Sequence, residues 1–187
     1  MSDARASLNG KWPLAIGTFL IAFLISLGVS LIPYAGQIIY FLVTAPLVVG
    51  ISFFALKIAR DQDPKTDDLF FSFNNNFGNA ILANLLVGIF AFIGFILLII
   101  PGIIVSLALS QTWFILAENP SMGSYEAIIK SKDMMKGYKW QYFKIGLRLL
   151  LLGLLCLLTL GIGFLWLMPY QYVVYAKFYD EVKAANA

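Results

Sequence analysis

Charged residues gather in four short clusters along this chain, and the long stretches between the clusters contain no Asp, Glu, Lys, Arg or His. These uncharged stretches cover residues 12–56, 69–117 and 149–176. About 20 apolar residues form a helix that crosses the hydrocarbon core of a bilayer, so we expect each stretch to provide two crossings. Because a charge at the bilayer centre is costly, the pattern predicts an integral membrane protein.

A segment typical of turns lies near the middle of each uncharged stretch, at residues 32–36, 100–102 and 159–163. In lipid only helices and closed barrels satisfy their backbone hydrogen bonds, and the alternation typical of strands is absent. We therefore predict an all-α, polytopic helical bundle in which six transmembrane helices form three hairpins. The predicted helices cover residues 13–32, 36–58, 77–99, 102–117, 138–160 and 163–181.

The three hairpins, at about 13–58, 77–117 and 138–181, resemble one another. Each begins with polar and aromatic residues, and each ends with an alanine shortly before charge returns. This likeness predicts a unit repeated about every 60 residues within a single domain, residues 1–187.

The positive charges predict how the hairpins are oriented. All 13 Lys and Arg residues lie in the N-terminal tail, in the linkers between hairpins and the first half of the helix that follows the second linker, or in the C-terminal segment, and the three turns carry none. The positive-inside bias then places both termini and both linkers in the cytoplasm. The first apolar segment is longer than that of a signal peptide, so we expect it to be retained as a helix.

Composition supports a membrane protein and narrows its chemistry. Hydrophobic residues make up 60% of the chain and charged residues 12%, with a mean hydropathy of +0.84. A net charge of +3 is too small to indicate a nucleic-acid partner. There is no histidine, and Cys156 is the single cysteine, so neither a disulfide framework nor a Cys-based metal site is available. Without a recognisable nucleophile or phosphate-binding loop, we expect no catalytic residues, no metal and no cofactor.

The first linker, residues 57–76, mixes charged residues with aromatic ones. Its composition favours a short segment at the headgroup level, with Asp67 and Asp68 capping a helix. The alternative is a divalent-cation site formed by Asp61, Asp63, Asp67 and Asp68, although their spacing does not match a calcium loop.

The second linker, residues 118–137, contains the signals of an amphipathic helix over 122–136. Asn119 and Pro120 are predicted to begin it, and Gly137 to end it. The expected apolar face is Met122, Tyr125, Ile128, Ile129 and Met135, with Lys130, Ser131 and Asp133 away from that face. We expect this helix to lie along the cytoplasmic interface.

Basic residues in and after this helix form the main candidate site for contact with lipid or a partner, and anionic headgroups are their natural ligand. These residues are Lys130, Lys132, Lys136, Lys139, Lys144 and Arg148. In the alternative interpretation the lysines only determine topology.

Neutral polar residues inside the uncharged stretches offer a second candidate site. Asn84, Gln111 and Gln171 could line a polar cavity for a solute, or they could join helices through hydrogen bonds. The stretches hold no ionisable group of the kind that ion-coupled transporters use.

Segments in the C-terminal half of the chain resemble a known family. The segment 115–120 reads Ile-Leu-Ala-Glu-Asn-Pro, and it is followed by 135–140 and then by the aromatic and glycine-rich segment 159–170. These segments resemble the bacterial integral membrane family numbered 975 among the domains of unknown function. That family is similar to the membrane domain of some glycerophosphoryl diester phosphodiesterases. The resemblance implies a multi-pass protein of the bacterial inner membrane, and it brings no catalytic residues.

Taken together, these features favour a non-enzymatic accessory or scaffold protein that organises lipid or a membrane partner. That partner would be another membrane protein or a second copy of this chain. The alternative is a small carrier or exporter of a neutral or amphipathic solute.

Overall fold

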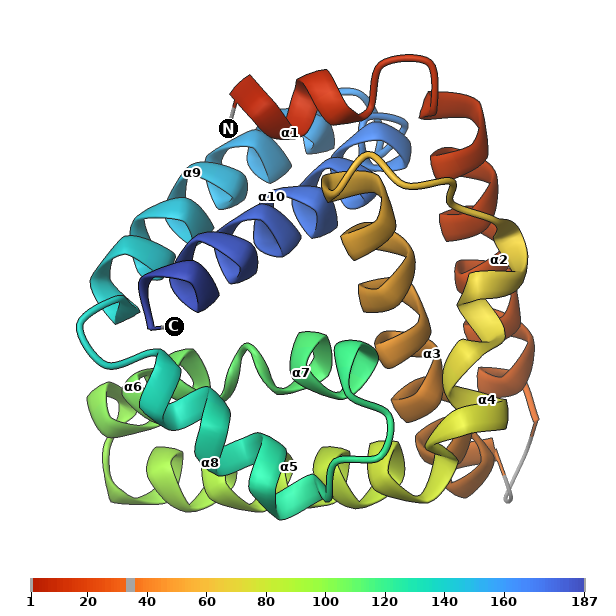
Figure 1. Ribbon diagram of the computed structural model, residues 1–187. Coiled ribbons are helices and arrows are strands. Elements are labelled where there is room, and N and C mark those ends of the chain that lie inside the picture. Colours follow the sequence, from red (N-terminus) through yellow and green to blue (C-terminus); the bar gives the residue numbers. More distant parts are fainter. Residues whose placement is uncertain (1, 33–35, 187) are drawn as a thin grey trace.

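The computed structural model describes residues 2–32 and 36–186, and every regular element in these ranges is a helix, as the all-α prediction requires (Figure 1). The predicted turn at 32–36 falls largely on residues outside the described ranges. The elements in chain order are α1 (Ser2–Ser7), α2 (Trp12–Ser30), α3 (Gly36–Ala59), the 3-10 helix η1 (Thr66–Phe70), α4 (Phe71–Asn75), α5 (Phe77–Leu97), α6 (Ile99–Leu109), α7 (Thr112–Glu118), α8 (Ser124–Met134), α9 (Lys139–Leu158) and α10 (Phe164–Ala185).

Within the described ranges, five helical segments are long and apolar enough to cross a membrane. They are Trp12–Ser30, Gly36–Ala59, Phe77–Ile96, Ile99–Glu118 and Lys139–Leu158. The predicted sixth segment forms α10, which lies outside this set because its second half carries four charged residues, from Lys177 to Lys183. Five spans are therefore supported by length and composition, and the sixth remains a prediction.

The outer helices expose a large apolar surface. Only 6% of the most apolar part of α9 and 17% of that of α5 is buried inside the protein, against 50% for α3. Leu150, Leu154 and Leu158 on α9 are all more than half exposed. A soluble monomer rarely leaves so continuous an apolar surface uncovered, so this surface fits a surrounding of lipid.

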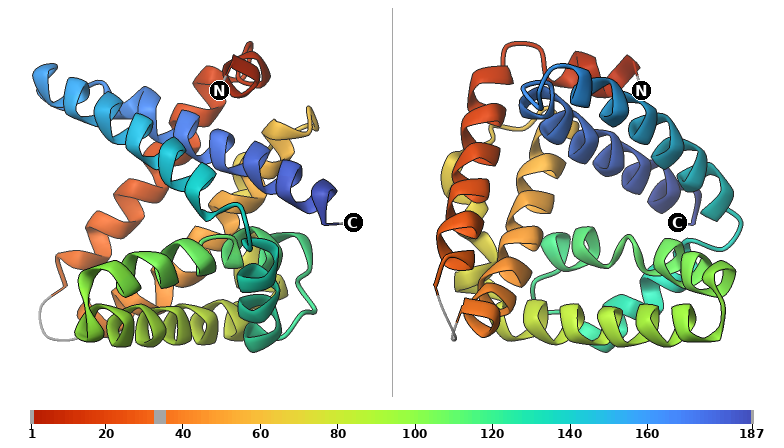
Figure 2. Two further views of the ribbon diagram at one scale, coloured as in Figure 1. Left: turned by 90° about the vertical axis from the view of Figure 1, so that its left-hand side faces the viewer. Right: turned by 180° about the vertical axis from the view of Figure 1, so that it is seen from behind.

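The three hairpins do not stand side by side with parallel axes. Figures 1 and 2 show α2 with α3, α5 with α6, and α9 with α10 as antiparallel pairs, and the α9/α10 pair crosses the α2/α3 pair steeply. As a result, the turn after α9 shares a groove with the N-terminal segment, lined by Thr159, Gly163, Arg5 and Trp12. Whether the hairpins are copies of one unit remains a prediction.

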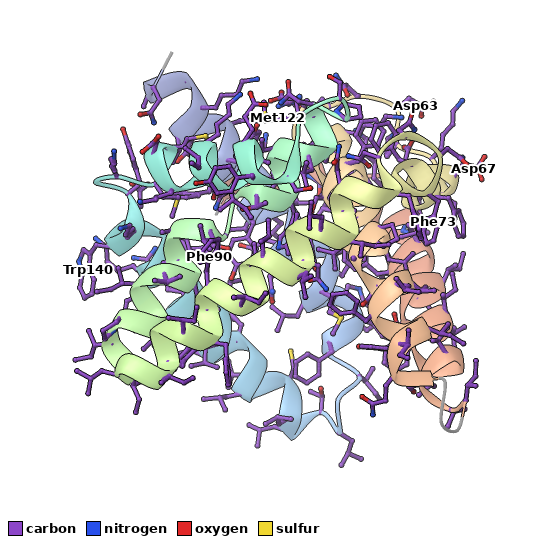
Figure 3. The ribbon with its side chains drawn as sticks, turned by 90° about the horizontal axis from the view of Figure 1, so that it is seen from below. Asp63, Asp67, Phe73, Phe90, Met122 and Trp140 are labelled. Carbon is purple, nitrogen blue, oxygen red and sulfur yellow. The ribbon has the colours of Figure 1, made fainter. Side chains whose placement is uncertain are left out.

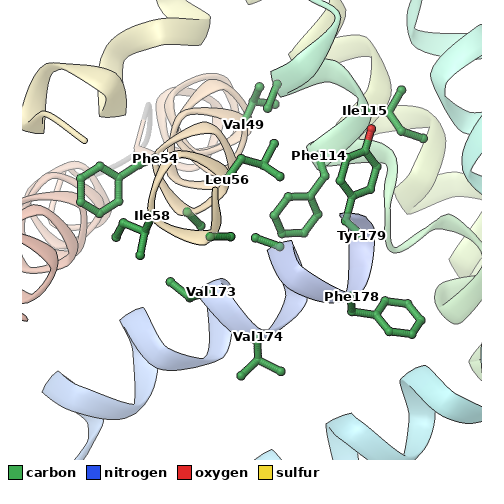
Figure 4. Close-up of a cluster of buried hydrophobic side chains, with 14 of the residues drawn as sticks. Val49, Phe54, Leu56, Ile58, Phe114, Ile115, Val173, Val174, Phe178 and Tyr179 are labelled. Carbon is green, nitrogen blue, oxygen red and sulfur yellow. The ribbon is translucent and has the colours of Figure 1, made fainter. Parts of the chain in front are cut away.

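The main apolar core lies where α3, α7 and α10 meet, and Figure 4 shows its side chains converging from these helices. Phe114 of α7 stacks on Tyr179 of α10 with ring centroids 5.7 Å apart. Phe54 of α3 packs edge-on against Phe19 of α2 at 6.4 Å. Because α3 contacts elements of every hairpin, it is the central helix of the fold.

The second hairpin differs from its prediction at two places. The chain turns at Leu98, which is extended, and Pro101 lies in the first turn of α6, where its missing N–H is not needed. The predicted helix 102–117 is divided between α6 and α7, because Ser131 of α8 accepts the backbone N–H of Gln111 at 3.2 Å and donates to the Ala108 carbonyl at 2.9 Å. A side chain from another element thus replaces bonds of the helix at the break.

The first linker packs against the middle of the α2/α3 hairpin. Leu69 of η1 is fully buried in a small cluster with Ala22 and Leu47. Leu47 lies 12 residues before the end of α3, which corresponds to about 18 Å along a helix, so Leu69 packs well inside the hairpin, and the position of this linker at the headgroup level stays a prediction. The close approach requires Gly50, since a Cβ there would overlap the Leu69 carbonyl oxygen.

Helix α8 is shorter than predicted and presents a different face. It begins after Gly123, whereas Asn119 ends α7, so the predicted start at Asn119 and Pro120 is wrong. The helix ends at Met134, before the predicted end at Gly137, and Gly137 has a positive φ of 83° in the turn that follows. The buried residues of α8 are Ser124, Ala127, Ile128, Ser131 and Met134, while Tyr125 and Ile129 are exposed. The buried face of α8 differs from the predicted apolar face because Ser131 is turned inward to the polar break between α6 and α7.

Candidate functional site

An ionic cluster joins the ends of three helices. Arg60, just after α3, contacts Glu118 at the end of α7 and Asp180 of α10, with Nη2 2.7 Å from Glu118 Oε1 and from Asp180 Oδ1. The Arg60 Nε also donates to both Asp180 oxygens at 3.2 Å. Glu118 Oε2 accepts hydrogen bonds from Tyr179 at 2.8 Å and from Lys183 at 2.7 Å.

The charges of the ionic cluster balance, because two cations face two carboxylates. The hydrogen bond to Asp180 raises the pKa of Arg60 above its ordinary value, although burial lowers it, so Arg60 stays charged. With every charge paired inside the protein, the ionic cluster holds the helix ends together and leaves no net charge for a ligand.

A second ion pair fastens the first linker to α3. Lys57 Nζ lies 2.7 Å from Asp68 Oδ1 and 5.0 Å from the ring centroid of Phe53. Asp68 also accepts the Lys65 N–H at 2.8 Å, which caps η1 as predicted for the acidic residues of this linker. In Figure 3 Asp63 and Asp67 project from the edge opposite Trp140. Among the described residues, no three Asp or Glu side chains converge in the way a metal requires.

The predicted basic patch is divided by the fold. Lys136 forms a pair with Asp133 at 2.8 Å, and this hydrogen bond lowers the pKa of Asp133. Lys130 is exposed on α8. Lys144 and Arg148 line a separate pocket of about 260 Å³ between α1, α9 and α10, together with acidic residues that include Glu181.

Lys132 and Lys139 line a long groove between the α5/α6 hairpin and α8, which we call the α5–α8 groove. Its volume is about 560 Å³, within the range of ligand sites in proteins. Apart from the two lysines and Tyr125, its lining is apolar or small, and no acidic residue takes part. The remaining lining residues are Phe90, Ile93, Gly94, Pro101, Ile104, Val105, Ala108, Leu109, Ile128 and Ile129.

The three amides predicted to line a polar cavity lie in different surroundings. Gln111 is fully buried at the α6–α7 break, where its Nε2 donates to Ser110 Oγ at 3.0 Å. Gln171 lines a groove of about 350 Å³ between α9 and α10 to which Asn84 and Gln111 do not contribute. Asn84 lies half-buried on α5. A shared cavity formed by the three amides therefore remains a prediction.

Two asparagines before and in α5 have roles that the sequence analysis did not identify. Asn76 is buried and donates to the Leu116 carbonyl at 2.9 Å, which satisfies an acceptor at the end of α7. Asn79 donates to the Met122 carbonyl at 3.0 Å, and Ser124 donates to the Asn79 carbonyl at 2.9 Å. The cluster of asparagines at 74–79 was the available signal, since such residues commonly bind free backbone groups near helix ends.

Comparison with known proteins gives one match. No curated protein and no solved structure matches the chain. Residues 89–186 match the family model described as "Protein of unknown function (DUF975)", which confirms the resemblance found in the C-terminal half. The similarity to the membrane domain of glycerophosphoryl diester phosphodiesterases stays a prediction. Since the match covers more than half of the 187 residues, the chain belongs to the family DUF975.

Proposed function

We propose that this protein is a non-enzymatic, multi-pass protein of the bacterial inner membrane that organises anionic lipid or a membrane partner. The observation that carries the proposal is the contrast between two sets of charges. In the ionic cluster every charge has a partner, whereas Lys130, Lys132 and Lys139 form no ion pair with any described residue. Unpaired lysines beside an exposed apolar surface suit anionic headgroups, which attract each basic residue by about 1 kcal/mol.

The test replaces the lysines of α8 and the start of α9 together. A variant with Gln at Lys130, Lys132, Lys136 and Lys139 should retain less anionic lipid or partner on purification, and high salt should have the same effect on the unmodified protein. The matched control is Asn84→Leu with Gln171→Leu, which removes polar groups and leaves the lysines intact. A loss of binding or transport in the amide variant, with the lysine variant unaffected, would favour a solute carrier instead.

The proposed orientation puts both termini in the cytoplasm, since the basic residues lie in the tail, the linkers and the C-terminal segment. It is tested by single cysteines at exposed positions in a Cys156→Ser background. Leu98→Cys should react with an impermeant thiol reagent from outside the cell, whereas Ser121→Cys and Ala184→Cys should react only after the membrane is opened.

Leu160→Cys tests the third hairpin separately. It lies at the α9–α10 turn and is 95% exposed. The steep crossing of this hairpin makes Leu160 the informative position, because labelling from outside would establish that α9 and α10 both cross the membrane. Labelling of Ala184→Cys from outside would overturn the proposed orientation.

A further inference from the structure

The α5–α8 groove combines an apolar interior with two cations in its lining. Its apolar residues come from α5, α6 and α8, and Lys132 and Lys139 come from the end of α8 and the start of α9. Ile104 and Ile93 in the lining are both close to half exposed, so the groove is open to its surroundings along the hairpin. An occupant would have to match an apolar surface and a positive charge at the same time.

Neither lysine of the groove forms a close ion pair with a described residue, although Lys132 attracts the Asp133 carboxylate at longer range. The neighbouring carboxylate Asp133 is already engaged by Lys136 at 2.8 Å. Both lysines lie against the hairpin whose sequence is uncharged from 69 to 117. A cation beside an apolar, lipid-facing surface is costly unless it reaches water or meets an anion, so this position favours a bound counter-charge.

The chemistry of the groove selects an anionic amphiphile. Two ammonium groups offer several N–H donors to phosphate oxygens. None of the described residues that line the groove is acidic, so none of them would hold a cationic headgroup. The apolar residues along α5 and α6 provide a surface for an acyl chain. Trp140 is 67% exposed beside Lys139 and projects away from the helices in Figure 3, a placement typical of aromatic residues at a headgroup layer.

We propose that the α5–α8 groove binds one anionic phospholipid, with its phosphate between Lys132 and Lys139 and an acyl chain along the apolar lining. This inference rests on the proposed function, because it names the ligand class and the site at which lipid is organised. It commits to a membrane lipid, since free phosphate would leave the apolar part of the groove uncovered.

The test measures how many lipid molecules remain bound to the full chain in detergent. The protein is equilibrated with equal amounts of phosphatidylglycerol and phosphatidylcholine, and native mass spectrometry counts each lipid. The unmodified protein should prefer phosphatidylglycerol. In Lys132→Gln with Lys139→Gln, the preference should fall by about fivefold for each lysine removed. Lys144→Gln with Arg148→Gln removes the same charge outside the groove, and it should keep the preference.

A second pair of variants tests the acyl chain. Ile104→Trp fills the groove and should remove the bound phosphatidylglycerol although both lysines remain. Ile103→Trp is the matched control, because Ile103 is the preceding residue of α6 and does not line the groove. Equal losses from the two basic pairs, or unchanged binding in Ile104→Trp, would overturn the groove site and leave general lipid binding intact. If the unmodified protein shows no preference for phosphatidylglycerol, both the groove site and the proposed lipid function fail.

Discussion

The ionic cluster should contribute to stability far more than an exposed pair of the same length. Arg60→Gln removes the guanidinium that holds Glu118 and Asp180 at 2.7 Å, and it leaves both carboxylates close together in a partly buried site. Removing one member of a buried ion pair typically costs about 3–5 kcal/mol, whereas an exposed pair is worth about 0–1 kcal/mol. The side chains here are 17–31% exposed, so we expect a loss of about 2–3 kcal/mol in the free energy of unfolding.

A double-mutant cycle separates the interaction from other effects of the substitutions. The free energy of unfolding is measured by denaturant titration in a fixed lipid–detergent mixture for Arg60→Gln, Asp180→Asn and the double variant. The coupling energy should be about 1–2 kcal/mol. The control cycle uses Lys136 and Asp133, whose separation of 2.8 Å is similar but whose side chains are 70% and 57% exposed. That coupling should be far weaker than the coupling in the ionic cluster and should vanish in high salt. Equal coupling energies in the two cycles would refute the argument from burial.

Two further predictions test the packing of the first linker and the local charge of α8. Gly50→Ala should destabilise the protein by about 2–3 kcal/mol, because the added methyl group would overlap the Leu69 carbonyl. Gly17→Ala is the control, since Gly17 lies in open space and the alanine should stabilise the helix slightly. Equal shifts of the thermal unfolding midpoint in the two variants would contradict this packing. The carboxyl of Asp133 should titrate below an ordinary Asp by NMR, because Lys136 donates to it. Its contribution to stability is then present above the unfolded pKa and lost as pH falls through the folded one. An unchanged midpoint in Lys136→Gln would show that the pair does not form.

The sequence alone determined the class of the protein and the stretches in which its long apolar helices lie. A bilayer excludes charge and unpaired backbone groups, so the three uncharged stretches had to form helices whatever their tertiary contacts. The predicted turn at 159–163 appears between α9 and α10, and Gly137 and Gly161 both have the positive φ that glycine adopts without strain. The family match over 89–186 includes the segments 115–120, 135–140 and 159–170 that carry the resemblance.

Only the tertiary structure decided which charges are free and which face of a linker is buried. Arg60 meets Glu118 and Asp180 across 58 and 120 residues, and no local pattern encodes such pairings. The sequence predicts Ser131 on the polar face of α8. In the structure Ser131 is hydrogen-bonded to the backbone at the break between α6 and α7. In the same way, packing of α8 against α5 and α6 separates Lys132 and Lys139 from the other basic residues. Hydropathy gives the preference of each residue for lipid or water. The packing of the helices determines which neighbours satisfy the hydrogen bonds and charges of a polar group.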